Sequence, residues 1–248
     1  MKHHRLWILA GLSLLLFLWL TVEPLAGIER PGVTYTGAVL DAQKNVLDPS
    51  AALKIDLPAG KHELKLTGGE MFYGKGSEPS HTIAIRSYDR AMDTTRLYRL
   101  GMSQGQPAML PIELGDRGGF IEAFIVDEWA RDNRGSMTLS VDGKTHLIDP
   151  RTNVLDLRKA VKLSAPMGTA MGITQLELED LRYGAGQPLA EECLARVRYL
   201  KSGRVEYVVL SPEHMDYPFE GAELALFLVD ETPKDNTGHV RINFRHPM

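Results

Sequence analysis

The sequence predicts an all-β protein with two tandem β-sandwich domains that follow one N-terminal transmembrane or signal helix. Three observations support this prediction. Short segments of alternating apolar and polar residues recur between Gly, Pro, Asp and Asn clusters, as is typical of sandwiches. The pattern of segments then restarts in the second half of the chain. Finally, a single long apolar run lies close to the N-terminus.

That apolar run predicts a membrane-spanning helix over residues 1–27. A basic start, MKHHR, is followed by LWILAGLSLLLFLWLTV, which holds 17 residues without a charge. This exceeds the roughly 7–15 residues of a secretory signal core and reaches the roughly 17–25 that cross a bilayer. Lys2 and Arg5 predict a cytoplasmic N-terminus, with the bulk of the chain on the other side of the membrane. Cleavage, which would release a secreted or periplasmic protein, is the alternative.

The cysteine content indicates the compartment. Cys193 is the single cysteine, so the chain forms no intramolecular disulfide. Secreted eukaryotic domains commonly rely on disulfides. We therefore expect a single-pass protein of the bacterial inner membrane with most of its chain in the periplasm.

The first sandwich domain is predicted over residues 28–149. Between Ala51 and Gly76, Leu53, Ile55 and Leu57 alternate with polar residues, Pro58-Ala59-Gly60 forms a turn, and the alternation resumes. This pattern predicts a hairpin with one buried face. The segments HTIAIRSYD, FIEAFIVDE and GSMTLSVDG continue it.

The second domain is predicted over residues 150–248, because its segments resemble those of the first. RKAVKLSAPMG corresponds to AALKIDLPAG, LELEDLRYGAG to LKLTGGEMFYGKG, and ELALFLVDE to IEAFIVDE. The best candidate for a helix is the short segment from Pro188 to Val197, PLAEECLARV.

An acidic loop occurs once in each domain. VDEWARDNRG begins at Val126 and VDETPKDNTG at Val229, and the two share Val-Asp-Glu, Asp-Asn and the final Gly. Turn formation alone explains Asp, Asn and Gly, because these residues bond to local amides and accept left-handed backbone. It does not explain a repeated acid at the end of the strand.

Calcium binding gives a reason for the spacing. Calcium takes six to eight oxygen ligands from carboxylates, amides, backbone carbonyls and water. Zinc is disfavoured because the loops lack the His and Cys ligands it prefers. The candidate ligands are Asp127, Asp132 and Asn133 in the first loop and Asp230, Asp235 and Asn236 in the second.

The element LTGGEMFYGKG, followed by an Asp-rich loop that ends Asn-x-Gly, resembles the calcium-dependent galactose-binding bacterial lectins and related jelly-roll modules. In those lectins a backbone carbonyl of a Tyr-Gly turn and an Asp/Asn-rich loop hold the ion. The resemblance therefore implies jelly-roll domains and adds Tyr73 to the first candidate site and Tyr183 to the second. The spacing from the first Asp to the Asp-Asn pair is shorter here, and Asp replaces the first amide of the pair.

Several functions are disfavoured. The net charge of −4 and the lack of a Lys/Arg-rich tract give no reason to expect nucleic acid as a partner. Gly101–Gly105, GMSQG, satisfies the hydrolase pattern Gly-x-Ser-x-Gly, but that elbow needs a helix after the serine. Gln-Gly-Gln-Pro follows instead. We identify no nucleophile and base pair, and expect no enzymatic activity.

Two functions remain. The first is an accessory or scaffold subunit of an envelope assembly, tethered to the membrane and binding protein partners, with calcium-stapled domains. The alternative is a calcium-dependent carbohydrate-binding protein that recognises a glycan. Loops that keep a water-accessible ion and a facing aromatic residue would favour the binder, and loops covered by protein would favour the staple. Trp129 lies inside the first loop, where an exposed tryptophan stacks on a sugar or contacts a partner and a covered one packs beneath its own loop.

Overall fold

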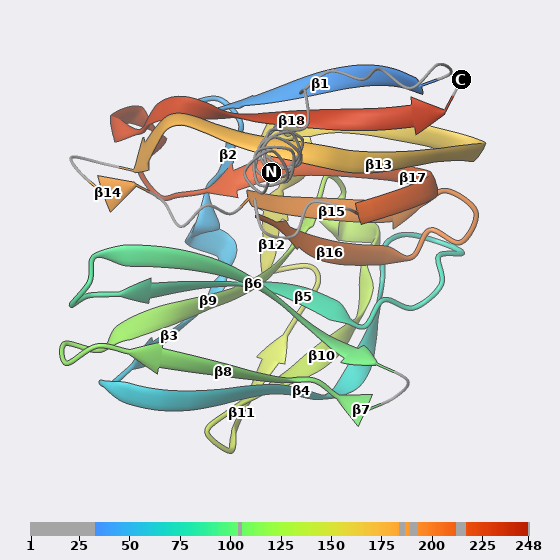
Figure 1. Cartoon of the computed structure of the whole chain (residues 1–248). Helices are drawn as coiled ribbons and strands as arrows, with labels where there is room; N and C mark the ends of the chain where they lie inside the picture. Colours follow the sequence, from blue (N-terminus) through green and yellow to red (C-terminus); the bar gives the residue numbers. More distant parts are fainter. Residues whose placement is uncertain (1–32, 104–105, 184–186, 189–192, 212–216, 248) are drawn as a thin grey trace, which may run out of the picture. The chain divides into compact units, whose positions relative to one another are not determined.

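Strands make up all the long elements of the computed structural model, which describes residues 33–103, 106–183, 187–188, 193–211 and 217–247 (Figure 1). The helical elements in this part of the chain are short 3₁₀ turns. The predicted all-β class is confirmed, and the antiparallel sheets are consistent with β-sandwiches. The described residues include no helix that is long and apolar enough to span a membrane. The predicted helix over residues 1–27 lies outside them.

We call the elements from η1 to β12 the first repeat. Two sheets form it: β11-β10-β4-β8, and β12-β9-β5-β6-β7 with β3 beside β9. The elements are η1 (Pro49–Ala51), β3 (Leu53–Leu57), β4 (Gly60–Phe72), β5 (Thr82–Asp89), β6 (Thr94–Ser103), β7 (Gln106–Pro107), β8 (Met109–Leu114), β9 (Gly119–Asp127), η2 (Ala130–Asp132), β10 (Arg134–Val141), β11 (Lys144–Ile148) and β12 (Val154–Asp156).

The second repeat comprises the elements from η3 to β18 together with the first two strands of the chain. Its sheet has the order β1-β18-β13-β17-β15-β16, with β14 beside β13 and β2 beside β17. The elements are β1 (Val33–Asp41), β2 (Val46–Leu47), η3 (Leu157–Lys159), β13 (Val161–Tyr183), β14 (Gln187–Pro188), β15 (Cys193–Tyr199), β16 (Val205–Leu210), β17 (Tyr217–Val229), η4 (Pro233–Asp235) and β18 (Thr237–Pro247).

The two repeats share their strand pairing, although strands that are separate in the first are fused in the second. In the first repeat β3 pairs with β9, and β4 pairs with β8 and β10. In the second repeat β13 alone takes the places of β3 and β4, with a register shift between Ala165 and Ala170. It pairs with β17, which takes the places of β8 and β9, and with β18. The internal repeat seen in the sequence is thus a repeat of topology.

The strands β1 and β2 complete the second repeat from the start of the chain. β1 lies beside β18, and β2 pairs with β17 in parallel. The corresponding strands of the first repeat, β11 and β12, come from the middle of the chain, and β12 pairs with β9 in parallel. Residues Thr34–Pro247 accordingly form one compact unit. The predicted boundary between residues 149 and 150 runs between β11 and β12 of the first repeat.

The apolar core continues from one repeat into the other. One cluster of buried side chains includes most inward residues of β4, β5, β9 and β10, and also Leu194, Tyr207 and Phe227 of the second repeat. A second cluster lies within the second repeat around Leu40, Leu226 and Phe244. Burial of large apolar side chains is the main force holding such sheets together.

The prediction of a helix at residues 188–197 was wrong for the described part of that segment. Residues 193–197 belong to β15 and are all buried. Leu194 belongs to the first apolar cluster, whereas Cys193, Ala195 and Val197 belong to the second, so both faces of β15 are covered. A segment buried on both faces carries no period that separates a strand from a buried helix.

Candidate functional site

The loop aspartate of the first repeat forms an ion pair with the second repeat. Asp127, at the end of β9, lies 3.2 Å from the guanidinium of Arg196 on β15 (Asp127 Oδ1 to Arg196 Nη2), and both side chains are largely buried. Burial raises the pKa of Asp127, while the positive charge of Arg196 and a hydrogen bond from Asn133 oppose that shift. A buried charge without such a partner would be costly. The pair therefore ties the first loop to the opposite repeat.

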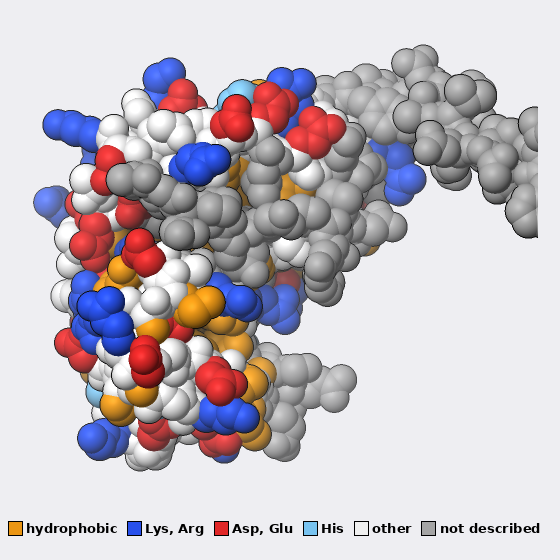
Figure 2. Space-filling model, turned by 60° about the vertical axis from the view of Figure 1, so that its left-hand side comes forward, with side chains coloured by type: hydrophobic (Ala, Val, Ile, Leu, Met, Phe, Trp, Pro, Cys, Tyr) orange, Lys and Arg blue, Asp and Glu red, His pale blue; other side chains and the backbone are white. Residues whose placement is uncertain are grey.

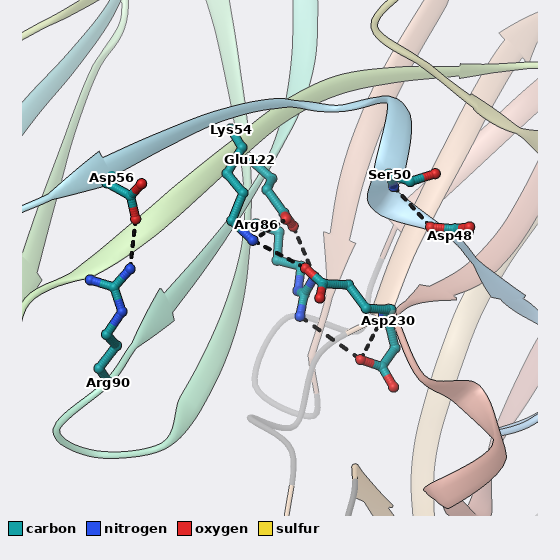
Figure 3. A network of polar contacts seen from close by, with 9 residues as sticks. Asp48, Ser50, Lys54, Asp56, Arg86, Arg90, Glu122 and Asp230 are labelled. Atoms are coloured by element: carbon teal, nitrogen blue, oxygen red, sulfur yellow. Dashed lines mark hydrogen bonds and ion pairs between the residues drawn. The ribbon is translucent and has the colours of Figure 1, made fainter.

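The second loop makes the reciprocal contact. Arg86 of β5 approaches Asp230, at 3.9 Å between Nη2 and Oδ1, and binds Glu122 of its own repeat at 2.8 Å. Figure 3 shows Arg86 between these two carboxylates. Arg86 and Arg196 occupy corresponding positions, because each pairs in register with the fifth residue before its own repeat's loop aspartate. Each repeat thus supplies an arginine to the other's loop.

The glutamate that follows each loop aspartate also pairs with a basic residue of the other repeat. Lys54 of β3 lies 3.2 Å from Glu231 (Nζ to Oε1), and Lys162 of β13 forms an ion pair with Glu128. Lys54 also lies 3.8 Å from the centre of the Phe120 ring, a cation–π contact. The Val-Asp-Glu sequence of each loop therefore faces an arginine and a lysine of the other repeat.

Each loop asparagine holds a turn of its own repeat. Asn133 Nδ2 donates to the carbonyl of Pro150 at 2.9 Å, and Asn236 Nδ2 donates to the carbonyl of Ala42 at 2.9 Å. Both asparagine residues are fully buried. In each case the carbonyl belongs to the turn between two strands, β11 and β12 or β1 and β2. A buried carbonyl needs such a donor, because leaving it unpaired costs free energy.

The final glycine of each loop is required by backbone geometry. Gly135 and Gly238 have φ values of 83° and 80°. A Cβ added to Gly135 would overlap the carbonyl oxygen of Glu70, and one added to Gly238 would overlap that of Asp180. Only glycine accepts both the left-handed backbone and this close approach.

The loop residues Asp127, Glu128, Asn133 and Gly135, and their counterparts in the second loop, thus each have a structural role. The ion pairs among them connect the repeats reciprocally, in the manner of the two subunits of a symmetric dimer. We call these ion pairs the exchange interface. It consists of Asp127–Arg196, Asp230–Arg86, Glu128–Lys162 and Glu231–Lys54.

A further recurrent segment of the sequence makes matching contacts within the two repeats. Asn45-Val46-Leu47-Asp48 recurs as residues 153–156. The side chain of Asn45 donates to the carbonyl of Lys159, and that of Asn153 to the carbonyl of Ala51 at a longer distance, 2.9 and 3.4 Å. Each of these turns is therefore bonded to the 3₁₀ element of its own repeat. The sequence contained this signal, and our sequence analysis missed it.

Tyr73 is part of the same contact between repeats. Its hydroxyl lies 3.0 Å from that of Tyr207, which in turn accepts a hydrogen bond from the backbone N–H of Val126 at 2.7 Å. The Arg196 guanidinium lies 5.2 Å from the centre of the Tyr73 ring. Burial raises the pKa of Tyr207 to about 12, so the hydroxyl stays neutral. Tyr73 is therefore a buried packing residue at the exchange interface.

The residues of the first predicted metal site approach one another in two pairs. An added Cβ on Gly74 would lie 3.1 Å from Asp132 Oδ2, so the turn after Tyr73 faces the Asp132 carboxylate. Asn133 bonds to Asp127. In the second site Asn236 bonds to Asp230, and Asp235 is exposed. Tyr183 ends β13 and pairs through its backbone with Gln187.

These residues fit calcium in part. The side-chain Oδ1 atoms of Asn133 and Asn236 are buried without a hydrogen-bond partner, so two amide oxygens are free to coordinate. The Asp127 carboxylate, however, already faces Arg196. Among the described residues, no group of three or more His, Cys, Asp or Glu side chains is arranged to hold a metal. A cation at Asp127 would compete with the guanidinium.

Trp129 is the most exposed large apolar side chain of the first loop, at 73%. The loop beneath it is fixed by a 3₁₀ turn, in which Asp132 N–H donates to the Trp129 carbonyl, and by the Asn133 hydrogen bond. Arg131 and Arg134 are exposed on the same loop. The second loop has exposed Thr232 at the corresponding position. The two loops therefore differ at this exposed position.

The segment with the hydrolase pattern forms no nucleophile elbow. Ser103 ends β6, and Gln106–Pro107 forms β7, which pairs back with it. A strand thus follows where the elbow needs a helix, as predicted. Sequence analysis also missed His62, whose Nδ1 lies 2.7 Å from Asp142 Oδ2 and whose Nε2 lies 2.9 Å from the Pro58 carbonyl. This histidine, on β4, bonds to the turn between β3 and β4 and takes no part in the exchange interface.

No protein-family model matches the chain, and no curated protein matches it.

Proposed function

We propose that the chain is a non-enzymatic docking subunit of a bacterial envelope assembly. It consists of two tandem jelly-roll-like β-sandwiches held at the periplasmic face of the inner membrane by an N-terminal helix. The observation that carries this proposal is the contrast between the two acidic loops. Their shared residues join the repeats, and the residue that differs, Trp129, is exposed on the surface.

The exchange interface makes the two repeats one rigid support. Four ion pairs and a continuous apolar core join them. A rigid support suits docking, because an ordered surface loses little entropy when a partner binds. The acids are engaged in holding the fold, which leaves them unsuited to serve as a catalytic pair.

Trp129 supplies the contact for a partner. Tryptophan and arginine are the residues most enriched among those that dominate binding energy. Trp129 stands beside exposed Arg131 and Arg134. We infer a protein partner that offers an apolar pocket flanked by carboxylates. Figure 2 shows acidic and basic side chains interspersed over one face of the protein, so Trp129 and its neighbours, rather than a field of one sign, would select the partner.

The N-terminal sequence supports the location. Its 17-residue uncharged run follows Lys2 and Arg5, which favour a cytoplasmic N-terminus. The single cysteine, Cys193, is buried, and burial raises its pKa to about 12, so it is no reactive thiol.

Site-specific photocrosslinking in native membranes tests the docking function. A photoreactive amino acid would replace Trp129 in one variant and Thr232, at the corresponding exposed position, in another. We expect a discrete adduct of one partner at 129 and none at 232. Trp129→Ala should weaken co-purification of that same partner by about 30-fold or more, as for an interface residue worth about 2 kcal/mol. Equal adducts at both positions, or an unaffected Trp129→Ala, would overturn the proposal.

A calcium-dependent carbohydrate-binding protein is the second candidate. The unpaired buried Oδ1 atoms of Asn133 and Asn236 favour it, because amide oxygens are calcium ligands. Thermal melts of the full chain in EDTA and in millimolar calcium distinguish the candidates. Calcium sites with a hundredfold excess of ion over Kd would add about 2.7 kcal/mol. A melting shift removed by Asn133→Ala with Asn236→Ala would justify a glycan screen, and no shift would reject calcium.

A further inference from the structure

Two exposed apolar side chains lie together at one end of the second repeat. Met167 is 63% exposed and Leu200 is 48% exposed. Both adjoin Gly221: a Cβ on Gly221 would lie 2.6 Å from Met167 Sδ, and the Leu200 N–H donates to the Gly221 carbonyl at 2.8 Å. Exposed Lys201 follows Leu200, and Glu220 beside them accepts a hydrogen bond from the Gly168 N–H. We call Met167, Leu200 and Lys201 the apolar tip.

Strand register shows that the chain enters the second repeat at this same end. Pro218 of β17 pairs with Gly172 of β13, which pairs with Arg245 of β18. From this row of paired residues, β17 continues toward its C-terminal end to Gly221, and β13 followed toward its N-terminal end reaches Met167. Both therefore run toward the apolar tip.

β1 runs the same way when followed toward its start. Gly37 lies against Ile242 and Asn243, and the Ala42 N–H donates to the Gly238 carbonyl, so β1 is antiparallel to β18. The N-terminal end of β1, at Val33, therefore points toward the apolar tip. Figure 1 shows the start of β1, the end of β18 and the turn between β15 and β16 at one end of the sheet.

Chain length then limits the distance to the membrane. Residues 23–32 separate Val33 from the 17-residue uncharged run of the N-terminal segment. At about 3.3–3.6 Å per extended residue they reach at most about 36 Å. This tether keeps the entry end of the sheet within that distance of the lipid surface, where even a weak contact is favoured by high effective concentration.

We propose that the apolar tip rests in the interfacial layer of the bilayer that holds the N-terminal helix. This rests on the proposed membrane anchor. Met167 and Leu200 enter the boundary between headgroups and acyl chains, and Lys201 reaches the lipid phosphates, as cationic residues do beside apolar anchors. The contact fixes the orientation of the protein on the membrane.

The first repeat provides a matched control. The turn between β5 and β6 corresponds to that between β15 and β16, and it exposes Met92 to a similar degree, 66%. The position of Met167 corresponds to Ala59, and that of Leu200 to Arg90, which pairs with Asp56 at 2.6 Å. The paired apolar side chains are therefore a feature of the repeat that receives the N-terminus.

Spin labelling of the full chain in nanodiscs of equal parts phosphatidylcholine and phosphatidylglycerol tests the proposal. Met167→Cys, Leu200→Cys and Met92→Cys each provide one site for a nitroxide, because the native Cys193 is fully buried. We expect the labels at 167 and 200 to be accessible to oxygen and several-fold less accessible to a water-soluble nickel chelate than the label at 92.

The outcomes separate the alternatives. Full access to nickel at 167 and 200 would place the tip in water, and exclusion of both reagents would place it against protein; either result overturns the lipid contact. Flotation of the full chain with vesicles of the same lipids checks the anchor separately. Failure to float would reject the anchor together with the tip, whereas flotation with nickel-accessible labels would reject the tip alone.

Discussion

The guanidinium of Arg196, on a strand of the second repeat, lies 3.2 Å from the carboxylate of Asp127, in the loop of the first. The side chains of the two residues are 5% and 12% exposed. Arg86 and Asp230 make the corresponding contact with the repeats exchanged. The doubled acidic sequence is thus explained by the way in which the two repeats bind one another.

A double-mutant cycle on Arg196 and Asp127 measures this contact. We expect Asp127→Ala to lower the free energy of unfolding by about 3–5 kcal/mol, because it leaves a buried arginine without its partner. Arg196→Met combined with Asp127→Ala should cost less than the sum of the two single changes, with a coupling of about 1–3 kcal/mol. Urea unfolding gives the values. The exposed pair Lys61 and Glu113, 4.0 Å apart, is the control and should show coupling near zero. Additive losses at Asp127 and Arg196 would contradict the interface.

The asparagine contacts should be equivalent in the two loops. Asn133→Ala removes the donor to the Pro150 carbonyl, and Asn236→Ala the donor to the Ala42 carbonyl. Each should lower the free energy of unfolding by about 1–3 kcal/mol, the cost of a buried group left unpaired. Chemical denaturation with EDTA present measures this without any contribution from calcium. Exposed Asp235→Ala should stay within about 0.5 kcal/mol of the unaltered protein. If both asparagine variants were as stable as the Asp235 variant, the hydrogen bonds would not be stabilising.

Glycine substitutions distinguish backbone strain from close approach. Gly135 and Gly143 have similar positive φ values, 83° and 81°, but a Cβ at Gly143 would meet nothing within 4 Å. Gly143→Ala should therefore cost only about 1–2 kcal/mol for left-handed backbone. Gly135→Ala, whose Cβ would overlap the Glu70 carbonyl, should cost clearly more, and Gly238→Ala should behave like it. Thermal melts of the three variants rank them. Equal melting temperatures would show that the strand beside Gly135 moves away without cost.

Stability should depend on the protonation of His62. Burial alone would lower its pKa, but hydrogen bonds to the Asp142 carboxylate and the Pro58 carbonyl, with the charge of Asp142, raise it above the ordinary 6.5. Both ring nitrogens face acceptors, so the protonated ring satisfies both. A raised folded-state pKa means that the contribution is complete below pH 6.5 and is lost as the pH rises through the folded-state value.

Urea unfolding of the unaltered protein and of His62→Gln at pH 5.5 and at pH 8.5 tests this. The stability difference between the two proteins should be larger at the lower pH. A difference that is the same at both pH values would show that the histidine is neutral throughout. Burial also raises the pKa values of Glu122, Asp127 and Asp230. These carboxyl groups start from ordinary values of 4.5, 3.8 and 3.8, which lie well below the 6.5 of histidine.

The fold was largely predictable because its signals are local. Alternation at Leu53, Ile55 and Leu57 identified a strand, and recurrence of such segments identified an all-β repeat. The exception, β15, is buried on both faces and shows no alternation. Likewise, nothing in the residues of β1 and β2 indicates that they complete the second repeat, because pairing between distant strands depends on the whole topology.

The candidate site was predictable in position but not in role. The repeated Asp127 and Asp230 marked the loops, and their calcium role stays a prediction. Their arginine partners lie far away in the sequence. The residues on either side of the two arginines also differ, since Ile85-Arg86-Ser87 corresponds to Ala195-Arg196-Val197. The sequence shows each loop next to its own strands, whereas the arginine and lysine residues that pair with the loop belong to the other repeat.

The order in which the strands are made determines when each repeat is able to close. The strands of the first repeat, β3 to β12, follow one another without interruption, so that repeat is able to assemble while the chain is still being synthesised. β1 and β2 are synthesised first, but β17 and β18, beside which they lie, come last. The second repeat is therefore completed only after β18 has left the ribosome. Until then β1 and β2 have exposed edges, and a chain stopped before β17 holds one finished repeat and two strands without their partners.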